Sequence, residues 1–204
     1  MSISETDLAR ILGEIQSGRT PMVWREPDGQ LLLHPSTRPA GFLSGSFDPL
    51  HEGHVALRSA AEAVLGGPVC FEMTLTNADK PPLDESTVVR RFSKLGLHTL
   101  VLTNAPTFAD KARLLPDSTF VVGFDTAERI LQVRFYGGRT DLMRASLETV
   151  REAGCCFLVA GRLLGNRFGT LRDLELPAEF DDLFRELPEE VFRSDVSSTE
   201  LREH

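Results

Sequence analysis

The sequence Gly45-Ser-Phe-Asp-Pro-Leu-His-Glu-Gly-His54 lies between two stretches of different periodicity. The apolar run 40–43 before it is typical of a buried strand, and residues 55–65 after it carry apolar side chains at helical spacing. His51 and His54 are three residues apart where this helix begins, so both imidazoles are expected on one face. A helix N-terminus presents free N–H groups and a partial positive charge, which attract anions such as phosphate. The pattern therefore predicts a strand, a tight turn and a phosphate-binding helix start.

Gly53 lies between the two histidines, where it costs about 1 kcal/mol of helix stability relative to alanine. What it offers is close approach of a flat ligand to the backbone. Simpler interpretations exist, because Gly-Ser and Asp-Pro are turn formers and histidines also occur on plain surfaces. A zinc-protease motif is excluded, since His-Glu-x-x-His needs histidines four residues apart. The whole string at a strand-to-helix junction favours a nucleotide-phosphate site.

From residue 40 onward, short apolar strands alternate with helices. The expected strands are 40–45, 68–75, 99–103, 118–123 and 155–160, and the expected helices are 54–65, 84–95, 107–114, 125–132 and 141–152. This alternation predicts an α/β fold with a doubly wound parallel sheet of five to six strands. Such sheets bind ligands at the carboxyl ends of their strands, near the switch point in strand order. The motifs discussed here follow predicted strands.

The two ends of the chain have different patterns. Residues 4–17 predict an amphipathic helix, and 22–25 and 30–33 flank a hairpin signal, so residues 1–38 are interpreted as an N-terminal extension and 39–204 as the main domain. Trp24, the single tryptophan, is expected to be a packing residue. The acidic stretch 175–190 is expected to be a solvated connector to a last helix.

Composition limits the classes of partner. The 204 residues carry a net charge of −8, with 41% hydrophobic and 25% charged residues, as in globular proteins that are not embedded in a membrane. No cluster of Lys and Arg stands out, which argues against long nucleic acids, while small phosphorylated ligands remain compatible with a locally positive site. The longest apolar runs are too short for a membrane span and no signal peptide is visible. With three cysteines expected to be reduced, a cytoplasmic location is predicted.

The first motif resembles the signature of the nucleotidyltransferase superfamily that includes nicotinamide and nicotinate mononucleotide adenylyltransferases. The second signature of that superfamily, a hydroxyl cluster before a helix that carries an arginine, resembles Ser197-Ser198-Thr199-Glu-Leu-Arg202. The resemblance implies that His51 and His54 contact the ATP phosphates, and that Ser197, Ser198, Thr199 and Arg202 hold the β- and γ-phosphates. Ser197 and Glu200 also match a capping box, a role that can coexist with phosphate binding.

Further positions gain a role from the same resemblance. Lys80, in the loop after the second strand, matches a basic residue that meets the phosphates, although a plain polar loop would look similar. Nucleotide contacts are implied for Gly45, Ser46, Phe47, Gly53, Gly123, Asp125 and Arg162. Asp125 alternatively caps a helix without any ligand, and Arg162 alternatively is a surface charge.

Two residue pairs leave alternatives open. Arg90 and Arg91 fit either the phosphate of a second substrate or a solvated helix face. Phe135 and Tyr136 fit either stacking on a pyridine ring or a place in the core. Residues 76–82, 106–112 and 120–126 also resemble a branch of stand-alone cytidylyltransferase-like proteins.

The predicted activity is that of an adenylyltransferase, which joins ATP and nicotinamide or nicotinate mononucleotide to give the dinucleotide and pyrophosphate. Mg²⁺, held mostly by phosphate oxygens and water, is the expected cofactor. Two alternatives stay open: a cytidylyl- or adenylyltransferase for another phosphorylated small molecule, and a non-catalytic nucleotide-binding protein. The sequence leaves the oligomeric state open, a homo-oligomer included.

Overall fold

The computed structural model describes residues 5–76, 85–96, 98–164 and 167–193. The helices are α1 (Glu5–Gln16), α2 (Glu52–Leu65), α3 (Glu85–Lys94), α4 (Phe108–Leu114), α5 (Phe124–Leu131) and α6 (Thr140–Glu152), with short 3-10 helices η1 (Val133–Tyr136), η2 (Leu171–Asp173) and η3 (Ala178–Leu183). The strands are β1 (Met22–Arg25), β2 (Leu31–Leu32), β3 (Gly41–Ser44), β4 (Val69–Thr74), β5 (Leu100–Thr103), β6 (Thr119–Gly123), β7 (Cys156–Ala160), β8 (Arg162–Leu164), β9 (Arg167–Gly169) and β10 (Phe184–Leu187).

The central sheet of the described residues has eight strands in the order β10-β7-β6-β3-β4-β5-β1-β2. The six strands from β10 to β5 pair in parallel, and only β1 and β2 are antiparallel additions. Numbered along the chain, the parallel strands have the order 3-2-1-4-5-6, the order of doubly wound dinucleotide-binding sheets. The predicted α/β class and mainly parallel sheet are confirmed. The order reverses between β3 and β6, which defines the switch point.

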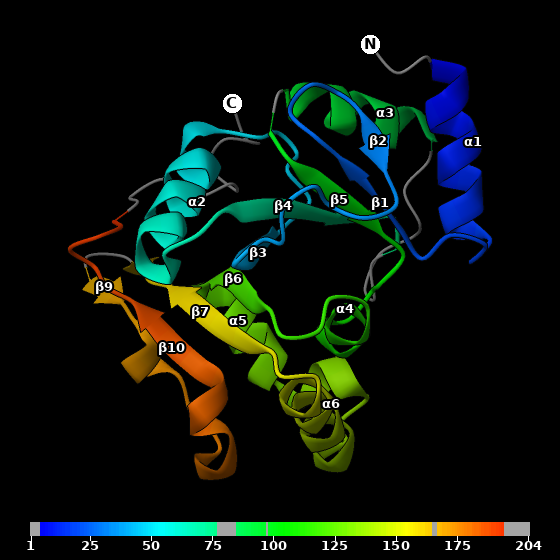
Figure 1. The fold of residues 1–204 in the computed structure, drawn as a ribbon. Helices are drawn as coiled ribbons and strands as arrows, with labels where there is room; N and C mark the ends of the chain where they lie inside the picture. The colour runs from blue at the N-terminus through cyan, green and yellow to red at the C-terminus, as the bar shows by residue number, and fades with distance from the viewer. Residues whose placement is uncertain (1–4, 77–84, 97, 165–166, 194–204) are drawn as a thin grey trace.

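Successive side chains of each parallel strand point to opposite faces of the sheet and therefore belong to two different hydrophobic clusters. Leu43, Phe71, Val121 and Leu158 belong to one cluster together with residues of α1, α2 and α3. Their strand neighbours Phe42, Cys70, Phe120, Val122, Phe157 and Val159 belong to a second cluster with residues of α4, α5 and α6. The sheet therefore lies between two helical layers, as Figure 1 shows.

The N-terminal region contains the helix α1 and the antiparallel strands β1 and β2, and these elements are attached to the main sheet. β1 pairs with β5 from Met22 to Arg25, and Ile15 of α1 is buried in the cluster that contains Phe92 of α3. Trp24 is 2% exposed and its ring lies 5.8 Å from that of Phe42, which confirms a packing role. Residues of α1 and β1 thus contribute to the same core as the parallel strands.

The prediction of a solvated connector over 175–190 is wrong. This stretch contains η3 and β10, and β10 pairs in parallel with β7 as the outer strand of the sheet. Phe180, Leu183, Phe184 and Leu187 are buried. Acidic residues dominate the composition here, but four apolar side chains spaced among them are enough to add a strand.

Two further findings concern the chain as a whole. Cys70, Cys155 and Cys156 are free thiols, the first two of them buried. In the described parts of the chain, no helix combines the length and apolar character that a membrane crossing requires.

Candidate functional site

The two histidines of the first motif form a close, tilted pair of rings at the start of α2. His51 is the N-cap and His54 the third residue of the helix, and their ring centroids are 3.8 Å apart with 33° between the planes. The backbone N–H of His51 donates to Nδ1 of His54 over 3.4 Å. The spacing of three residues therefore places both rings at the first helical turn, where backbone N–H groups lack partners within the helix.

Both imidazoles are held in the neutral form at pH 7. Burial, and then the neighbouring His51, lower the pKa of His54 to about 4. Burial also lowers the pKa of His51 below its usual value. Because Nδ1 of His54 accepts a hydrogen bond, the ring proton is on Nε2. The site thus offers a neutral N–H donor beside a helix N-terminus, which suits a phosphate oxygen.

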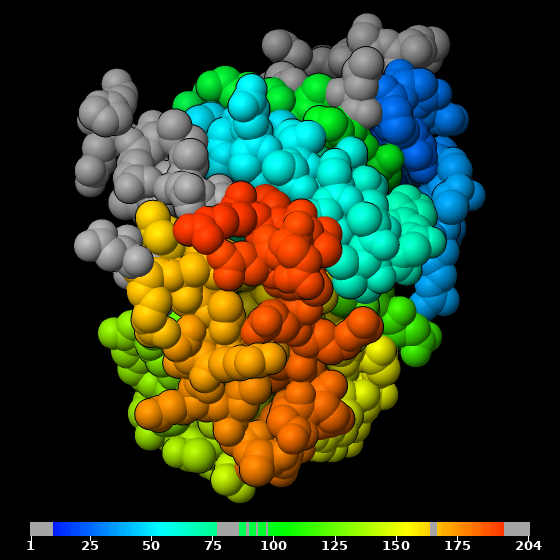
Figure 2. Space-filling view, turned by 90° about the vertical axis from the view of Figure 1, so that its left-hand side faces the viewer, coloured from blue at the N-terminus to red at the C-terminus, as the bar shows by residue number. Residues whose placement is uncertain are grey.

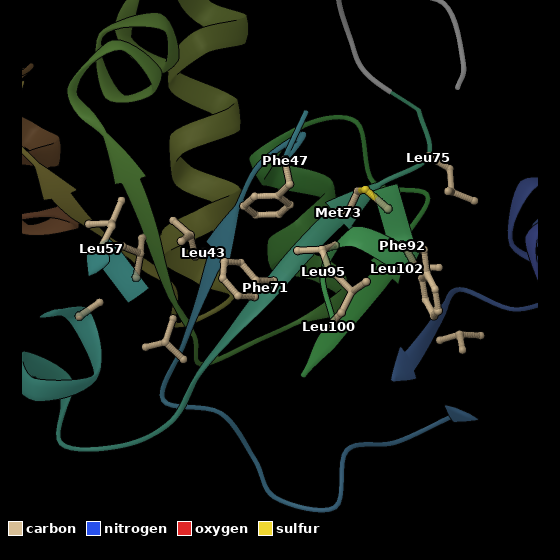
Figure 3. Packing of buried hydrophobic residues seen from close by; sticks show 14 of the residues in the cluster. Leu43, Phe47, Leu57, Phe71, Met73, Leu75, Phe92, Leu95, Leu100 and Leu102 are labelled. Atoms are coloured by element: carbon tan, nitrogen blue, oxygen red, sulfur yellow. The ribbon is translucent and has the colours of Figure 1, made fainter. Parts of the chain in front are cut away.

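The side chain of Phe47 packs against His54 of this pair. It is 2% exposed, and its ring meets those of His54 and Phe71 edge-on at centroid distances of 5.2 and 5.0 Å. Figure 3 shows Phe47 beside Phe71 on this face of the sheet. A Cβ atom on Gly45 would lie only 2.8 Å from the Phe47 ring, so glycine is required there for packing. Gly45 and Phe47 were predicted as nucleotide contacts. In this structure the Phe47 ring is part of the core and Gly45 makes room for it, so only the backbone atoms of these two residues are available to a ligand.

The start of α5 forms the other side of the switch point. Gly123 ends β6 and is the N-cap of α5, and a Cβ atom built there would meet no described atom within 4 Å. Asp125 is the second residue of α5 and forms an ion pair with Arg162, which follows β7. The two side chains are 56% and 36% exposed, so the pair is accessible to solvent. The start of α5, with this ion pair, is thus an open and charged corner of the site. The start of α2, with the histidine pair, is a packed corner.

The sheet brings the two corners together. β3 and β6 are neighbouring parallel strands, so the turns that follow them leave the same edge of the sheet. α2 packs on one face and α5 on the other. A crevice at the carboxyl ends of such strands is where open α/β sheets bind their ligands. His51, His54, Gly123, Asp125 and Arg162 are thus gathered around one switch point.

Arg90 and Arg91 do not form a solvated helix face as a pair. Nη2 of Arg91 lies 2.6 Å from Oδ2 of Asp48, and Nη1 donates to the carbonyl oxygen of Ser46 over 3.2 Å. Arg90 lies 3.7 Å from Oδ1 of the same carboxylate and is 54% exposed. Ser46, predicted as a nucleotide contact, thus has its carbonyl committed to Arg91. Sequence patterns gave no signal for this contact, because Arg91 and Asp48 are 43 residues apart.

The stretch 106–112, noted for its family resemblance, has a structural explanation. Thr107 caps α4 in a reciprocal arrangement with Asp110. Nζ of Lys111 lies 2.6 Å from Oε2 of Glu72, and both side chains are buried. Thr103 donates to the other oxygen of Glu72 over 2.7 Å. This buried ion pair joins α4 to the sheet and lies outside the candidate site.

Several predicted site residues lie outside the described residues: Lys80, Ser197, Ser198, Thr199 and Arg202. The described chain nevertheless approaches α2 before it reaches the second motif. Phe192, which lies five residues before Ser197 in the sequence, belongs to the hydrophobic cluster that includes Leu57 of α2. Figure 2 shows this last described segment, in red, against the cyan surface of α2.

The two aromatic residues after α5 differ in their surroundings. Phe135 is 37% exposed, and the guanidinium groups of Arg129 and Arg134 lie 4.6 and 4.9 Å from its ring centroid. The Tyr136 hydroxyl donates to the carbonyl oxygen of Ile130, which gives it a structural role. Phe135 is therefore the more exposed of the two residues, with two guanidinium groups against its ring.

The chain matches no model of a known protein family and no curated protein sequence. The motifs and the geometry described above are therefore the features that indicate a function. Among the described residues, no group of three or more His, Cys, Asp or Glu side chains is arranged to hold a metal ion.

Proposed function

We propose that this protein is a nucleotidyltransferase that uses ATP. The observation that carries the proposal is the position of the His51–His54 pair: the first turn of α2, directly after β3, at the switch point of a doubly wound sheet. A phosphate placed there meets N–H groups of the helix start and a neutral imidazole donor at once. The resemblance of residues 45–54 to the superfamily signature supports the same activity.

In the proposed reaction, a phosphate oxygen of the second substrate attacks the α-phosphorus of ATP in line, and pyrophosphate leaves. His54, and His51 beside it, donate hydrogen bonds to phosphate oxygens as negative charge redistributes. Because Phe47 fixes the His54 ring, little reorganisation accompanies the reaction, which is the condition for strong electrostatic stabilisation. By resemblance, Lys80 meets the phosphates, and the second motif holds the β- and γ-phosphates.

Mg²⁺ is proposed to enter with the nucleotide. Since no described group of side chains is arranged to chelate an ion by itself, phosphate oxygens and water are taken as its main ligands. Asp48 and Asp125, one acidic residue from each corner, are each paired with an arginine. When bound, the ion would neutralise the leaving pyrophosphate.

For the second substrate we propose nicotinamide or nicotinate mononucleotide, which the resemblance favours. The ring of Phe135, which lies beyond the C-terminal end of α5 and is 37% exposed, is a candidate surface for the pyridine base. Its two arginine neighbours place positive charge close to that ring, as an anionic substrate requires.

The test is pyrophosphate release in the presence of Mg²⁺. ATP or CTP is offered against both pyridine mononucleotides and a panel of alcohol phosphates. The proposal expects turnover with ATP and one pyridine mononucleotide. Turnover with CTP or another acceptor would keep the chemistry and replace the substrate. If the folded protein binds ATP by calorimetry yet turns over nothing on the panel, the catalytic proposal fails in favour of a nucleotide-binding protein.

A further inference from the structure

We propose that Arg91 of α3 is a positioning residue that holds the β3–α2 loop, and through it the histidine pair, in place. Its guanidinium reaches two points of this loop: the carbonyl oxygen of Ser46 at 3.2 Å and Oδ2 of Asp48 at 2.6 Å. These two residues flank Phe47, so the arginine spans the residue whose ring supports His54. The consequence for turnover rests on the proposed function, whereas the consequence for the loop does not.

The surroundings of Arg91 make this contact stronger than an ordinary surface ion pair. The Arg91 side chain is only 12% exposed, while that of Asp48 is 37% exposed. Exposed ion pairs contribute little, because solvent screens them and two side chains must be ordered. A largely buried guanidinium that meets a carboxylate and a backbone carbonyl is less screened, and its fixed donor geometry defines where the loop lies.

Phe47 connects this anchor to the site. Its backbone has a φ of 46°, a left-handed conformation that is uncommon for a residue other than glycine and that needs support from its surroundings. The ring is buried between Phe71 and His54. If the loop loses its anchor, Phe47 has freedom to leave this position, and the His54 ring loses its apolar neighbour.

The experiment compares Arg91→Gln with Lys94→Gln, a matched control that removes one positive charge from an exposed position of the same helix. The first readout is the pKa of His54, followed by NMR of the imidazole C–H signals and assigned with a His54→Gln variant. Loss of the anchor lets water reach His54, so in Arg91→Gln its pKa should rise from about 4 towards the usual 6.5. The Lys94→Gln variant should leave it unchanged.

The second readout is kinetic and uses whichever substrate pair shows turnover. Misplacing a catalytic group by about 1 Å can cost as much as 100-fold, so kcat of Arg91→Gln should fall about 10- to 100-fold, with KM changed much less. Arg91→Lys should recover part of the loss, because an ammonium reaches one of the two acceptors. Lys94→Gln should match the parent protein within about 2-fold.

The outcomes separate this inference from the proposed function. If the parent protein has no transferase activity, the NMR comparison still decides the role of Arg91. A folded Arg91→Gln protein with an unchanged His54 pKa would overturn the inference. Should Arg91→Gln not fold, Asp48→Asn removes the carboxylate from the other side of the contact, and the same rise in the His54 pKa is expected.

Discussion

The turns that follow β3 and β6 meet at one switch point, yet they are built in different ways. The β3–α2 turn contains a buried aromatic ring, a closely packed histidine pair and contacts to the largely buried Arg91. The β6–α5 turn has an uncovered glycine and one solvent-accessible ion pair, Asp125–Arg162. Fixed donors favour stabilisation of charge that moves during a reaction, whereas an accessible pair is free to exchange partners with a ligand. We therefore propose that the first turn carries the chemistry and that the second turn accommodates the nucleotide.

The largest effect is expected from Phe47→Ala, because this ring belongs to both the core and the support of His54. Removal of a buried phenylalanine ring costs about 3–5 kcal/mol of unfolding free energy. Chemical denaturation measures the loss. Phe135→Ala is the matched control beyond the second turn, where the ring is 37% exposed, and should change stability by about 0.5 kcal/mol at most. Equal losses in the two variants would contradict the contrast between a packed and an open turn.

The packed turn should also make stability sensitive to acid. The pKa of His54 is about 4 in the folded protein and about 6.5 in an unfolded chain, so between these values the unfolded state binds the extra proton. Stability should therefore fall as the pH decreases from 6.5 to 4, and the part due to His54 is about 2 kcal/mol once partial exposure is considered. His51 and His98, whose pKa values burial also lowers, act in the same direction.

Denaturation curves at pH 7 and pH 4.5 measure this dependence. The loss on acidification should be smaller in His54→Gln than in the parent protein. His34→Gln, at an exposed position of the N-terminal hairpin, is the control and should retain the parent dependence. The assignment of a buried neutral His54 is wrong if the two variants lose the same stability.

A smaller effect is expected from Gly123→Thr in the open turn. Threonine is as good an N-cap as glycine and a Cβ atom meets no described atom here, so stability should stay within about 0.5 kcal/mol. If a nucleotide approaches the backbone at this point, the added side chain should weaken ATP binding about 10-fold by calorimetry, a cost of about 1.4 kcal/mol. Unchanged affinity would remove Gly123 from the binding site.

The local part of this molecule could be predicted from its sequence. Alternating strands and helices gave the α/β class, and the spacing of His51 and His54 placed both at the start of a helix, as found. Contacts between distant segments could not be predicted. β10 is buried because it pairs with β7, and the role of Arg91 comes from its contact with Asp48, 43 residues away in the sequence. Neither feature has a local sequence pattern. For Phe47, the motif suggested a ligand contact where burial shows a core residue.

The most direct test of the account compares His54→Ala with His98→Ala in the pyrophosphate-release assay. His98 is a matched control, since its ring also packs edge-on against a phenylalanine, Phe71, at 5.3 Å, but it precedes β5 and so lies away from the carboxyl ends of the strands. We expect His54→Ala to stay folded and to lose about 100- to 1,000-fold in rate, while His98→Ala keeps its activity. Full activity in folded His54→Ala would contradict the account.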